Sequence, residues 1–442
     1  MTTALPPRIR RATPALAAAA LTTALLAACA GTPAAESAGG TGTPTAEATT
    51  PAPTERSTAI PRLTVTYDGG VLVLDATSLE VVADLPSQDE GYLRVNPAGD
   101  GRHVLVSTTG GFQVLDAGTW GEAHGDHAHF YTLDPQLTDV TYPAEKPGHV
   151  VVHDGRTALF DDGTGDVTVL DAAHVGDGPD DARTYTTPSA HHGVAVELHD
   201  GTLVVSEGTE EARTGARALD AENTETAASD QCPGVHGESV AQGDVVAIGC
   251  QDGVVLFADG AFTKVQSPDA YGRIGNQASS EASPVVLGDY KVDKDAELER
   301  PTRVSLVDTR TASLTLVDLP SSYTFRSLAR GDHGEALVLG TDGSIHVIDP
   351  ETATILRSMP VVDAWEEPLD WQVARPAIKV HDGTAYVTDP ATRSIHAVDV
   401  ETGEVFRTVT LDVVPDELAV ATGEAVAHDD HDHADDEHQD LT

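Results

Sequence analysis

Short apolar segments that alternate with polar residues recur along the chain. A typical unit is VLVLDATSLEVVADL at 71–85, an apolar segment that ends in Asp, a turn, and a second apolar segment. Val, Ile, Leu and Thr follow the period of two that is typical of β-strands, and helical periodicity is nearly absent. Similar units begin at residues 112, 167, 304, 345 and 395. The pattern predicts an all-β protein.

The aspartates at the ends of these segments give the repeat length. They are Asp75, Asp116, Asp171, Asp308, Asp349 and Asp399. Most of them are 41 to 55 residues apart, and the longer interval between Asp171 and Asp308 divides into three units of about 46. Many short strands at this period predict a β-propeller with four-stranded antiparallel blades. The intervals favour eight blades, with seven as the alternative.

Asp-Gly pairs separate several of the apolar segments. They occur at 154–155, 200–201, 252–253, 342–343 and 382–383. Asp-Gly suits type I′ hairpin turns, in which both central residues need a positive φ. The apolar segment at 417–420 has no neighbouring partner in the sequence. We expect it to supply the inner strand of the first blade, which would close the ring and remove an open sheet edge.

The N-terminus has the three zones of a secretory signal. Arg8, Arg10 and Arg11 precede an Ala- and Leu-rich run that ends in Leu26-Ala27-Ala28-Cys29. The run is short for a membrane span, and its ending resembles the bacterial lipobox, in which the cysteine carries a lipid. An ordinary signal peptide with a chance cysteine is the alternative. We therefore expect a signal peptide at 1–28, a lipidated Cys29 with a flexible tether at 29–58, a propeller at 59–424 and a disordered tail at 425–442.

Charge and cysteine content narrow the range of partners. The chain has 26 basic and 71 acidic residues, a net charge of −45. Such a chain repels nucleic acid, whose binding depends on Lys and Arg contacts to phosphate, and attracts cations. The three cysteines leave Cys232 and Cys250 once Cys29 is lipidated, and an even pair in an exported protein indicates a disulfide. Both cysteines fall on the same face of the expected blade.

Nineteen histidines in an acidic chain are its most conspicuous chemical feature. His124, His127 and His129 lie in an insertion at about 117–135 that lengthens the second blade. Alternate residues of a strand share one side, and imidazole nitrogen is a good Zn²⁺ ligand. The alternative interpretation is a polar surface loop.

A second set of histidines stands at the starts of three successive inner strands. These are His149 in KPGHVVV, His192 in AHHGVAV and His236 in CPGVHGE. Blades that follow one another would direct these imidazoles towards the axis on one face, as a pre-organised metal site requires. Solvated histidines that line a channel are the alternative. The insertion starts on the other face, so it either folds back to join this set or forms a separate site with His153.

The remaining histidines point less clearly to a site. His153, His199 and His381 each precede an Asp-Gly pair and fit surface turns, and His346 and His396 fit outer strands. The C-terminal run from His428 to His438 interleaves four histidines with carboxylates. Its composition predicts a disordered segment that either collects metal loosely or only adds solubility.

Taken together, HGDHAHFY at 124–131, KPGHVVVHDG at 146–155, HHG at 191–193 and CPGVHGE at 232–238 resemble the AztD-type zinc metallochaperones. The resemblance covers about residues 60 to 421. It implies an exported β-propeller that binds Zn²⁺ and passes it to the solute-binding protein of a zinc importer of the ATP-binding-cassette class. It also implies zinc ligation by the two histidine sets, and a disulfide between Cys232 and Cys250. Two departures are the C-terminal position of the His/Asp-rich run and the lipobox.

The sequence thus predicts a monomeric, non-enzymatic zinc carrier, held by its lipid on the outer side of the cell membrane. Binding needs deprotonated imidazoles, so zinc affinity should fall as the pH drops through about 6.5. A surface-anchored propeller that acts as a protein-binding scaffold is the first alternative, because propeller faces commonly bind proteins. A zinc-dependent enzyme is the second, but the chain lacks HExxH, a Gly-x-Ser-x-Gly elbow and a phosphate-binding Gly loop.

Overall fold

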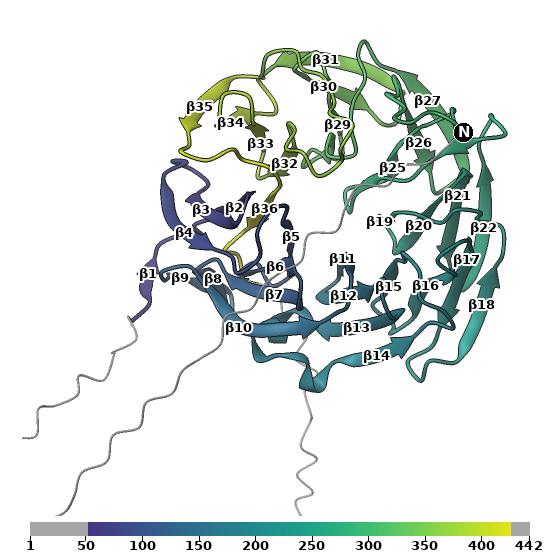
Figure 1. The fold of residues 1–442 in the computed structure, drawn as a ribbon, viewed down its shortest axis with the longest axis horizontal. Coiled ribbons are helices and arrows are strands. Elements are labelled where there is room, and N and C mark those ends of the chain that lie inside the picture. Colours follow the sequence, from purple (N-terminus) through teal and green to yellow (C-terminus); the bar gives the residue numbers. More distant parts are fainter. Residues whose placement is uncertain (1–51, 426–442) are drawn as a thin grey trace, which may run out of the picture. The chain divides into compact units, whose positions relative to one another are not determined.

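The computed structural model describes residues 52–425, which form antiparallel β-sheets arranged in a ring (Figure 1). The described helices are two short 3₁₀ turns, η1 (Ala172–Asp177) and η2 (Pro179–Asp181). The prediction of an all-β propeller with four-stranded antiparallel blades is confirmed. None of the described helices has the length and apolar character to cross a membrane.

The first half of the chain forms four of these sheets, here called blades 1 to 4 and given from the innermost strand outwards. Blade 1 contains β36 (Leu418–Ala421), β2 (Arg62–Tyr67), β3 (Gly70–Asp75) and β4 (Val81–Pro86). Blade 2 contains β5 (Arg94–Pro97), β6 (His103–Thr108), β7 (Gly111–Asp116) and β10 (Gln136–Pro143). Blade 3 contains β11 (Pro147–His153), β12 (Arg156–Asp161), β13 (Asp166–Asp171) and β14 (Arg183–Thr186). Blade 4 contains β15 (Ala195–Glu197), β16 (Leu203–Gly208), β17 (Arg213–Leu219) and β18 (Glu225–Ser229).

The second half of the chain forms blades 5 to 8 in the same way. Blade 5 contains β19 (Glu238–Ala241), β20 (Val245–Cys250), β21 (Asp252–Ala258) and β22 (Ala261–Gln266), and the short β23 (Gly272–Arg273) pairs with β21. Blade 6 contains β24 (Gln277–Ser280), β25 (Ser283–Asp289), β26 (Arg303–Asp308) and β27 (Ser313–Asp318). Blade 7 contains β28 (Leu328–Arg330), β29 (Ala336–Leu339), β30 (Ser344–Asp349) and β31 (Thr354–Pro360). Blade 8 contains β32 (Ile378–His381), β33 (Thr384–Asp389), β34 (Ser394–Asp399) and β35 (Val405–Thr410).

The end of the folded chain closes the ring, as the unpartnered segment at 417–420 predicted. Strand β36 pairs antiparallel with β2, and Leu418 lies opposite Val65. The innermost strand of blade 1 therefore comes from the C-terminal part of the chain and its other strands from the N-terminal part. This pairing removes an open edge that would otherwise be available to another chain.

The repeated aspartate has a local structural role. It is the last residue of the third strand in six blades. Its carboxylate accepts a backbone N–H two or three residues further on, as from Thr77 to Asp75 at 3.0 Å and from Thr402 to Asp399 at 2.7 Å. An aspartate that stabilises the following turn in this way is favoured there over other residues.

The apolar side chains of each blade pack against the next blade. Val73 of blade 1 shares a buried cluster with Val104 and Leu115 of blade 2. On its other side, blade 1 packs Leu63 against Ile395 of blade 8. Each fully buried side chain of this size contributes about 1.5–3 kcal/mol to stability. The core is therefore distributed between the blades, and the inner strand ends remain available for polar side chains.

The type I′ prediction is correct at two of the five Asp-Gly pairs. Asp154 and Asp382 both have φ near +45°, and the following glycines also have positive φ. It is wrong at Asp200, Asp252 and Asp342, which have negative φ. At Asp200 and Asp342 the loop has three residues with glycine in the left-handed region, a common alternative hairpin geometry, and Asp252 opens strand β21.

The insertion in blade 2 is a hairpin of β8 (Thr119–His124) and β9 (His127–Thr132). A third strand, β1 (Thr54–Arg56), pairs with β9. The end of the segment 29–58, predicted to be a flexible tether, is thus ordered here, because β9 offers a free edge and the Arg56 side chain donates to Thr132 at 2.8 Å. The predicted signal peptide, the lipidated Cys29 and the tail after Ala425 lie outside the described residues.

Candidate metal centre

The structure brings His149, His192 and His236 together at the inner ends of blades 3, 4 and 5. His149 lies on β11, and the other two precede β15 and β19. The ring centroids are 5.0 Å apart for His149 and His192, 5.0 Å for His192 and His236, and 5.7 Å for His149 and His236. One ligand atom from each ring lies within 4.8 Å of the others. We call these three residues the axial group.

Each ring of the axial group directs its Nδ1 atom to an oxygen. His149 contacts the Glu238 carboxylate at 3.0 Å, His192 contacts Asp162 at 2.5 Å, and His236 contacts the Gly275 carbonyl at 2.6 Å. A hydrogen on each Nδ1 leaves Nε2 with a free lone pair, which is the usual arrangement of a metal-binding histidine. The Nε2 atoms of His149 and His192 are 3.4 Å apart, so two lone pairs face the same point.

Burial and charge affect the axial histidines differently. Burial opposes protonation of His149, but the Glu238 carboxylate outweighs it and raises the pKa of His149. Burial lowers the pKa of His236, and the neighbouring His149 and Arg273 lower it further. His236 is therefore neutral at physiological pH, and a neutral imidazole is the form that binds metal.

Glycines next to the axial histidines permit the close packing. A Cβ on Gly193, which follows His192, would lie 2.2 Å from the Phe160 ring. Gly237, which follows His236, has φ of +75°, and a Cβ there would lie 2.3 Å from the Gly275 carbonyl oxygen. The His-Gly pairs that the sequence shows thus have a steric cause, because only glycine fits beside each histidine.

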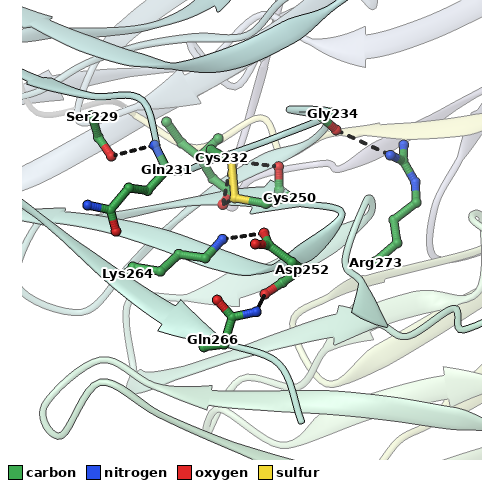
Figure 2. Close-up of a disulfide and its surroundings, with 11 residues drawn as sticks. Ser229, Gln231, Cys232, Gly234, Cys250, Asp252, Lys264, Gln266 and Arg273 are labelled. Atoms are coloured by element: carbon green, nitrogen blue, oxygen red, sulfur yellow. Dashed lines mark hydrogen bonds and ion pairs between the residues drawn. A yellow bond between two sulfur atoms is a disulfide. The ribbon is translucent and has the colours of Figure 1, made fainter. Parts of the chain in front are cut away.

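The Cys232–Cys250 disulfide is present in the structure and holds the segment that carries His236 (Figure 2). Both cysteines are fully buried, and their Cα atoms are 5.0 Å apart. The same segment is held from the other side by Arg273, which donates to the Gly234 carbonyl at 3.2 Å. The bridge therefore ties the approach to β19 to the end of β20, next to the axial group.

The hairpin histidines form a second, separate group. The ring centroids of His124, His127 and His129 are 5.0 to 5.8 Å apart, and their ligand atoms also lie within 4.8 Å. His127 contacts Asp126 at 3.2 Å, and His129 contacts Glu55 on β1 at 3.0 Å. This hairpin group is more exposed than the axial group, since the His127 and His129 side chains are 54% and 40% exposed and those of His149 and His192 are 17% and 37% exposed.

The two sets do not combine, and His153 joins neither of them. His153 instead contacts Asp244 at 3.2 Å, and His199 contacts Asp154 at 2.8 Å. His191, the neighbour of His192, is buried and bonds to Ser189 and Ser206. His346, on the third strand of blade 7, is buried and contacts Ser358 of the neighbouring strand β31. These histidines have structural partners outside the two groups.

The oxygens that orient the histidines are the part that sequence reasoning missed. Glu238 is within the motif CPGVHGE, two residues after His236, but it contacts His149 of another blade. Asp162 and Glu55 are 30 and 74 residues from the histidines that they contact. No local pattern marks such long-range partners, so only the folded arrangement identifies them.

Chemically, each group offers three imidazole nitrogens around one point. Zinc sites in proteins commonly have four tetrahedral ligands, and three histidines leave one position open. A water molecule or a ligand from another protein is able to fill that position. The geometry and donor type of both groups therefore suit Zn²⁺, and imidazole also suits copper and nickel.

Comparisons with known proteins agree with this chemistry. The zinc chaperone AztD of Citrobacter koseri is 26% identical over 375 residues, which cover 84% of this chain and 88% of the relative. A crystal structure of Citrobacter koseri AztD superimposes with a TM-score of 0.71, at 25% identity over 84% of this chain and 100% of that structure. The structure of its apo form superimposes with a TM-score of 0.69, at 24% identity over 82% of this chain and 98% of that structure. The dihydro-heme d1 dehydrogenase NirN shares only the fold, with 10% identity over 82% of this chain and 75% of its own, and a TM-score of 0.53.

No family model matches the chain. The similar protein from Citrobacter koseri is named a zinc chaperone, in agreement with the prediction that this protein has no catalytic role. Similarity in sequence and in fold over 84% of the chain thus confirms the resemblance that the histidine motifs predicted, and the protein is a β-propeller similar to the zinc chaperone AztD.

Proposed function

We propose that this protein is an exported zinc metallochaperone that binds Zn²⁺ through the axial and hairpin groups and passes it to the solute-binding protein of a zinc importer of the ATP-binding-cassette class. The observation that carries the proposal is that three imidazoles from three blades converge, each with its Nδ1 held by an oxygen. Such second-sphere partners fix the tautomer and the orientation of a metal ligand. The name of the relative supports zinc as the metal.

The axial group is the tighter of the two sites in this proposal. Its histidines are held by backbone and carboxylate oxygens before metal arrives, so little ordering entropy is lost on binding. The hairpin group is exposed and gains only two carboxylate contacts, from Asp126 and Glu55. We assign the hairpin group to capture and exchange, and the axial group to storage until a partner docks.

The last described residue, Ala425, packs on the strand that carries His124. A Cβ on Gly121 of β8 would lie 2.4 Å from the Ala425 backbone nitrogen, so the last described residue packs directly on this strand. The His/Asp-rich run starts at His428, three residues after Ala425, and Gly121 precedes His124 by three residues. Metal collected by the tail would therefore be delivered close to the hairpin group.

A lipid on Cys29 would keep the carrier at the outer side of the cell membrane, where an importer's binding protein collects zinc. The monomeric state, the tether and the anchor remain predictions from the sequence. Mass spectrometry of the mature protein from its native membrane tests the anchor directly. A diacylated N-terminal Cys29 is expected, and an unmodified soluble protein would contradict the anchor without affecting the zinc proposal.

Equilibrium dialysis with elemental analysis tests zinc binding. The His149, His192 and His236 triple alanine variant should lose its tight zinc, and the corresponding hairpin variant should lose a weaker zinc. A matched control changes His174 and His199 to Ala, since both also contact carboxylates but belong to neither group. Unchanged zinc content in both triple variants would contradict the proposal. If the axial triple variant does not fold, the single variant His192→Ala is measured instead, because the side chain that it removes is 37% exposed.

A transfer experiment tests the proposed partner. Zinc-loaded protein is mixed with metal-free solute-binding protein in the presence of a chelator that captures any free Zn²⁺. Direct ligand exchange should move zinc to the partner at a rate that the chelator does not alter. Transfer that the chelator abolishes would show release of free metal and would contradict the chaperone mechanism.

A further inference from the structure

The space around the propeller axis contains a cavity of about 210 Å³ next to the axial group. Its lining includes His149, Glu238 and residues of the innermost strands β5, β24, β28, β32 and β36. Three cations, Arg94, Arg326 and Lys379, also reach it. Positive charge is therefore concentrated inside a protein whose net charge is −45.

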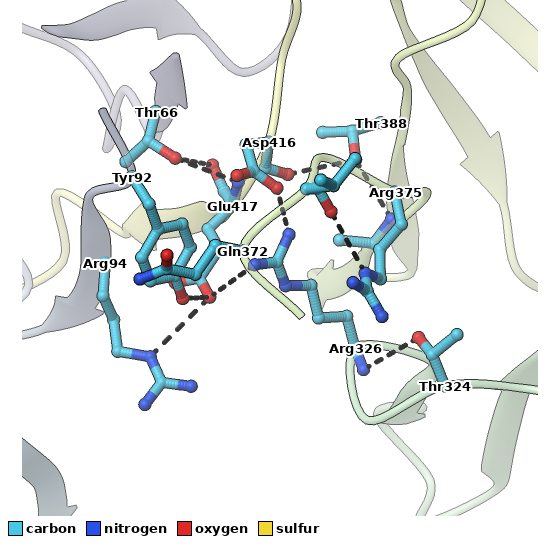
Figure 3. A network of polar contacts seen from close by, with 12 residues as sticks. Thr66, Tyr92, Arg94, Thr324, Arg326, Gln372, Arg375, Thr388, Asp416 and Glu417 are labelled. Atoms are coloured by element: carbon cyan, nitrogen blue, oxygen red, sulfur yellow. Dashed lines mark hydrogen bonds and ion pairs between the residues drawn. The ribbon is translucent and has the colours of Figure 1, made fainter. Parts of the chain in front are cut away.

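Two of these cations, Arg94 and Arg326, share the carboxylate of Glu417 (Figure 3). Glu417 is shared by Arg326 at 3.3 Å, Arg94 at 3.6 Å and the Tyr92 hydroxyl at 2.5 Å. Arg326 makes a second ion pair with Asp416, and its side chain is only 5% exposed. Glu238, which also lines the cavity, is engaged with His149.

Two of the cations keep donors that no protein group uses. Figure 3 shows Arg94 linked to Glu417 through Nε, and among residues 52–425 its terminal nitrogens make no hydrogen bond of ordinary length, although the Tyr92 oxygen lies near enough to help raise the pKa of Arg94. In the same part of the chain, the Lys379 ammonium has no hydrogen-bond or ion-pair partner within range. Neighbouring protein atoms lower the pKa of Lys379, Glu417 opposes this and Arg94 adds to it, although the Lys379 side chain itself is exposed. Solvent reaches both side chains, since Lys379 is exposed and the Arg94 side chain is 35% exposed, so their donors are available to a ligand that enters the cavity.

We propose that the axial cavity binds a small oxyanion, a carboxylate or phosphate, between Arg94 and Lys379. A guanidinium presents parallel N–H donors that match a carboxylate or phosphate group, and the ammonium adds a second, freely oriented donor. The volume admits a small organic or inorganic anion but no folded partner. The site does not use the imidazoles, so its existence is independent of the proposed zinc function.

Isothermal titration calorimetry of the metal-free full-length protein tests this site, with succinate and inorganic phosphate as separate probes at constant ionic strength. One site per chain is expected to saturate at millimolar concentrations or below. A preference for succinate would assign the site to organic acids, and a preference for phosphate would assign it to inorganic or esterified phosphate. Failure of both probes to bind would overturn the proposal.

Variants identify the cations involved. Arg94→Gln and Lys379→Gln should each weaken binding by about tenfold or more, because a charge-assisted contact is lost. Lys379→Arg keeps the charge and should retain binding, which separates loss of the site from loss of the fold. Lys294→Gln is the matched control, since its ammonium contacts Asp295 on the outer surface. Equal affinity in the parent protein, Arg94→Gln and Lys379→Gln would overturn the assignment.

Discussion

Replacement of Asp162 by Ala tests whether the oxygens behind the axial histidines set the zinc affinity. Asp162 contacts no metal in our proposal and acts only through His192, to which it is hydrogen-bonded at 2.5 Å. It also accepts from the Gly193 backbone N–H at 3.3 Å. Without the carboxylate, the His192 ring loses the group that holds Nδ1–H and directs Nε2 towards His149.

The size of the effect follows from the exposure of this pair. A hydrogen bond to a charged group contributes about 1.5–3 kcal/mol. The His192 side chain is 37% exposed and that of Asp162 is 18% exposed, so solvent screens part of the interaction and the lower half of the range applies. About 1.5–2 kcal/mol corresponds to a tenfold to thirtyfold weaker zinc site, within the range expected for second-sphere partners.

Competition with a chromophoric zinc chelator measures this change. Asp177→Ala is the matched control, since Asp177 contacts His174 at 3.0 Å in an exposed pair outside both groups. The control should bind zinc like the parent protein, and His192→Ala should lose more affinity than Asp162→Ala. If His192→Ala weakened zinc binding while Asp162→Ala stayed within twofold of the parent, the orienting role of the carboxylate would be refuted.

Three further predictions concern stability and the path of the metal. Replacing Cys232 and Cys250 by Ser opens a loop of sequence separation 18 and should lower the free energy of unfolding by about 3 kcal/mol in urea titrations; an unchanged midpoint would contradict it. Backbone N–H donors outweigh burial and lower the pKa of Asp161, so its contribution to stability is present at neutral pH and is lost below about pH 4. In Asp161→Asn, the free energy of unfolding should therefore fall less steeply as the pH drops below about 4. A slope equal to that of the parent protein would refute this. Gly121→Val should displace Ala425 and slow zinc uptake from a weak chelator to the rate of a chain truncated after Ala425; wild-type uptake would contradict delivery by the tail.

Local chemistry explains which parts of the fold the sequence reveals. The aspartate of each repeat is visible because it bonds to a backbone N–H two or three residues away, a requirement that recurs in every such turn. Ring closure by β36 is visible because an apolar segment without a partner must pair with something. In contrast, Thr54–Arg56 has no apolar pattern, and its pairing with β9 depends on an edge formed more than 70 residues later.

The axial group was predictable in outline because strand order places three blade starts side by side. Its detailed chemistry was not, since the positions of Asp162 and Glu238 depend on contacts between blades. The HHG motif illustrates the difference: the sequence singles out His192 by its place before the strand, whereas the burial of His191 beside Ser206 appears only in the folded protein. The disulfide lies between these cases, because cysteine number predicts it and strand geometry permits it.

Charge is distributed in opposite ways on the exterior and in the axial cavity, and this has a consequence for zinc release. The acidic exterior attracts Zn²⁺, whereas Arg94 and Lys379 lie in the cavity beside His149 and repel it. Neutral histidines add no charge, so Glu238 and Asp162 supply the negative charge that the axial site requires. An anion held by Arg94 and Lys379 would cancel the repulsion, and linkage then requires zinc and the anion to strengthen each other by the same factor. If both proposals hold, loss of the anion when a partner docks would weaken the axial site at the moment of transfer.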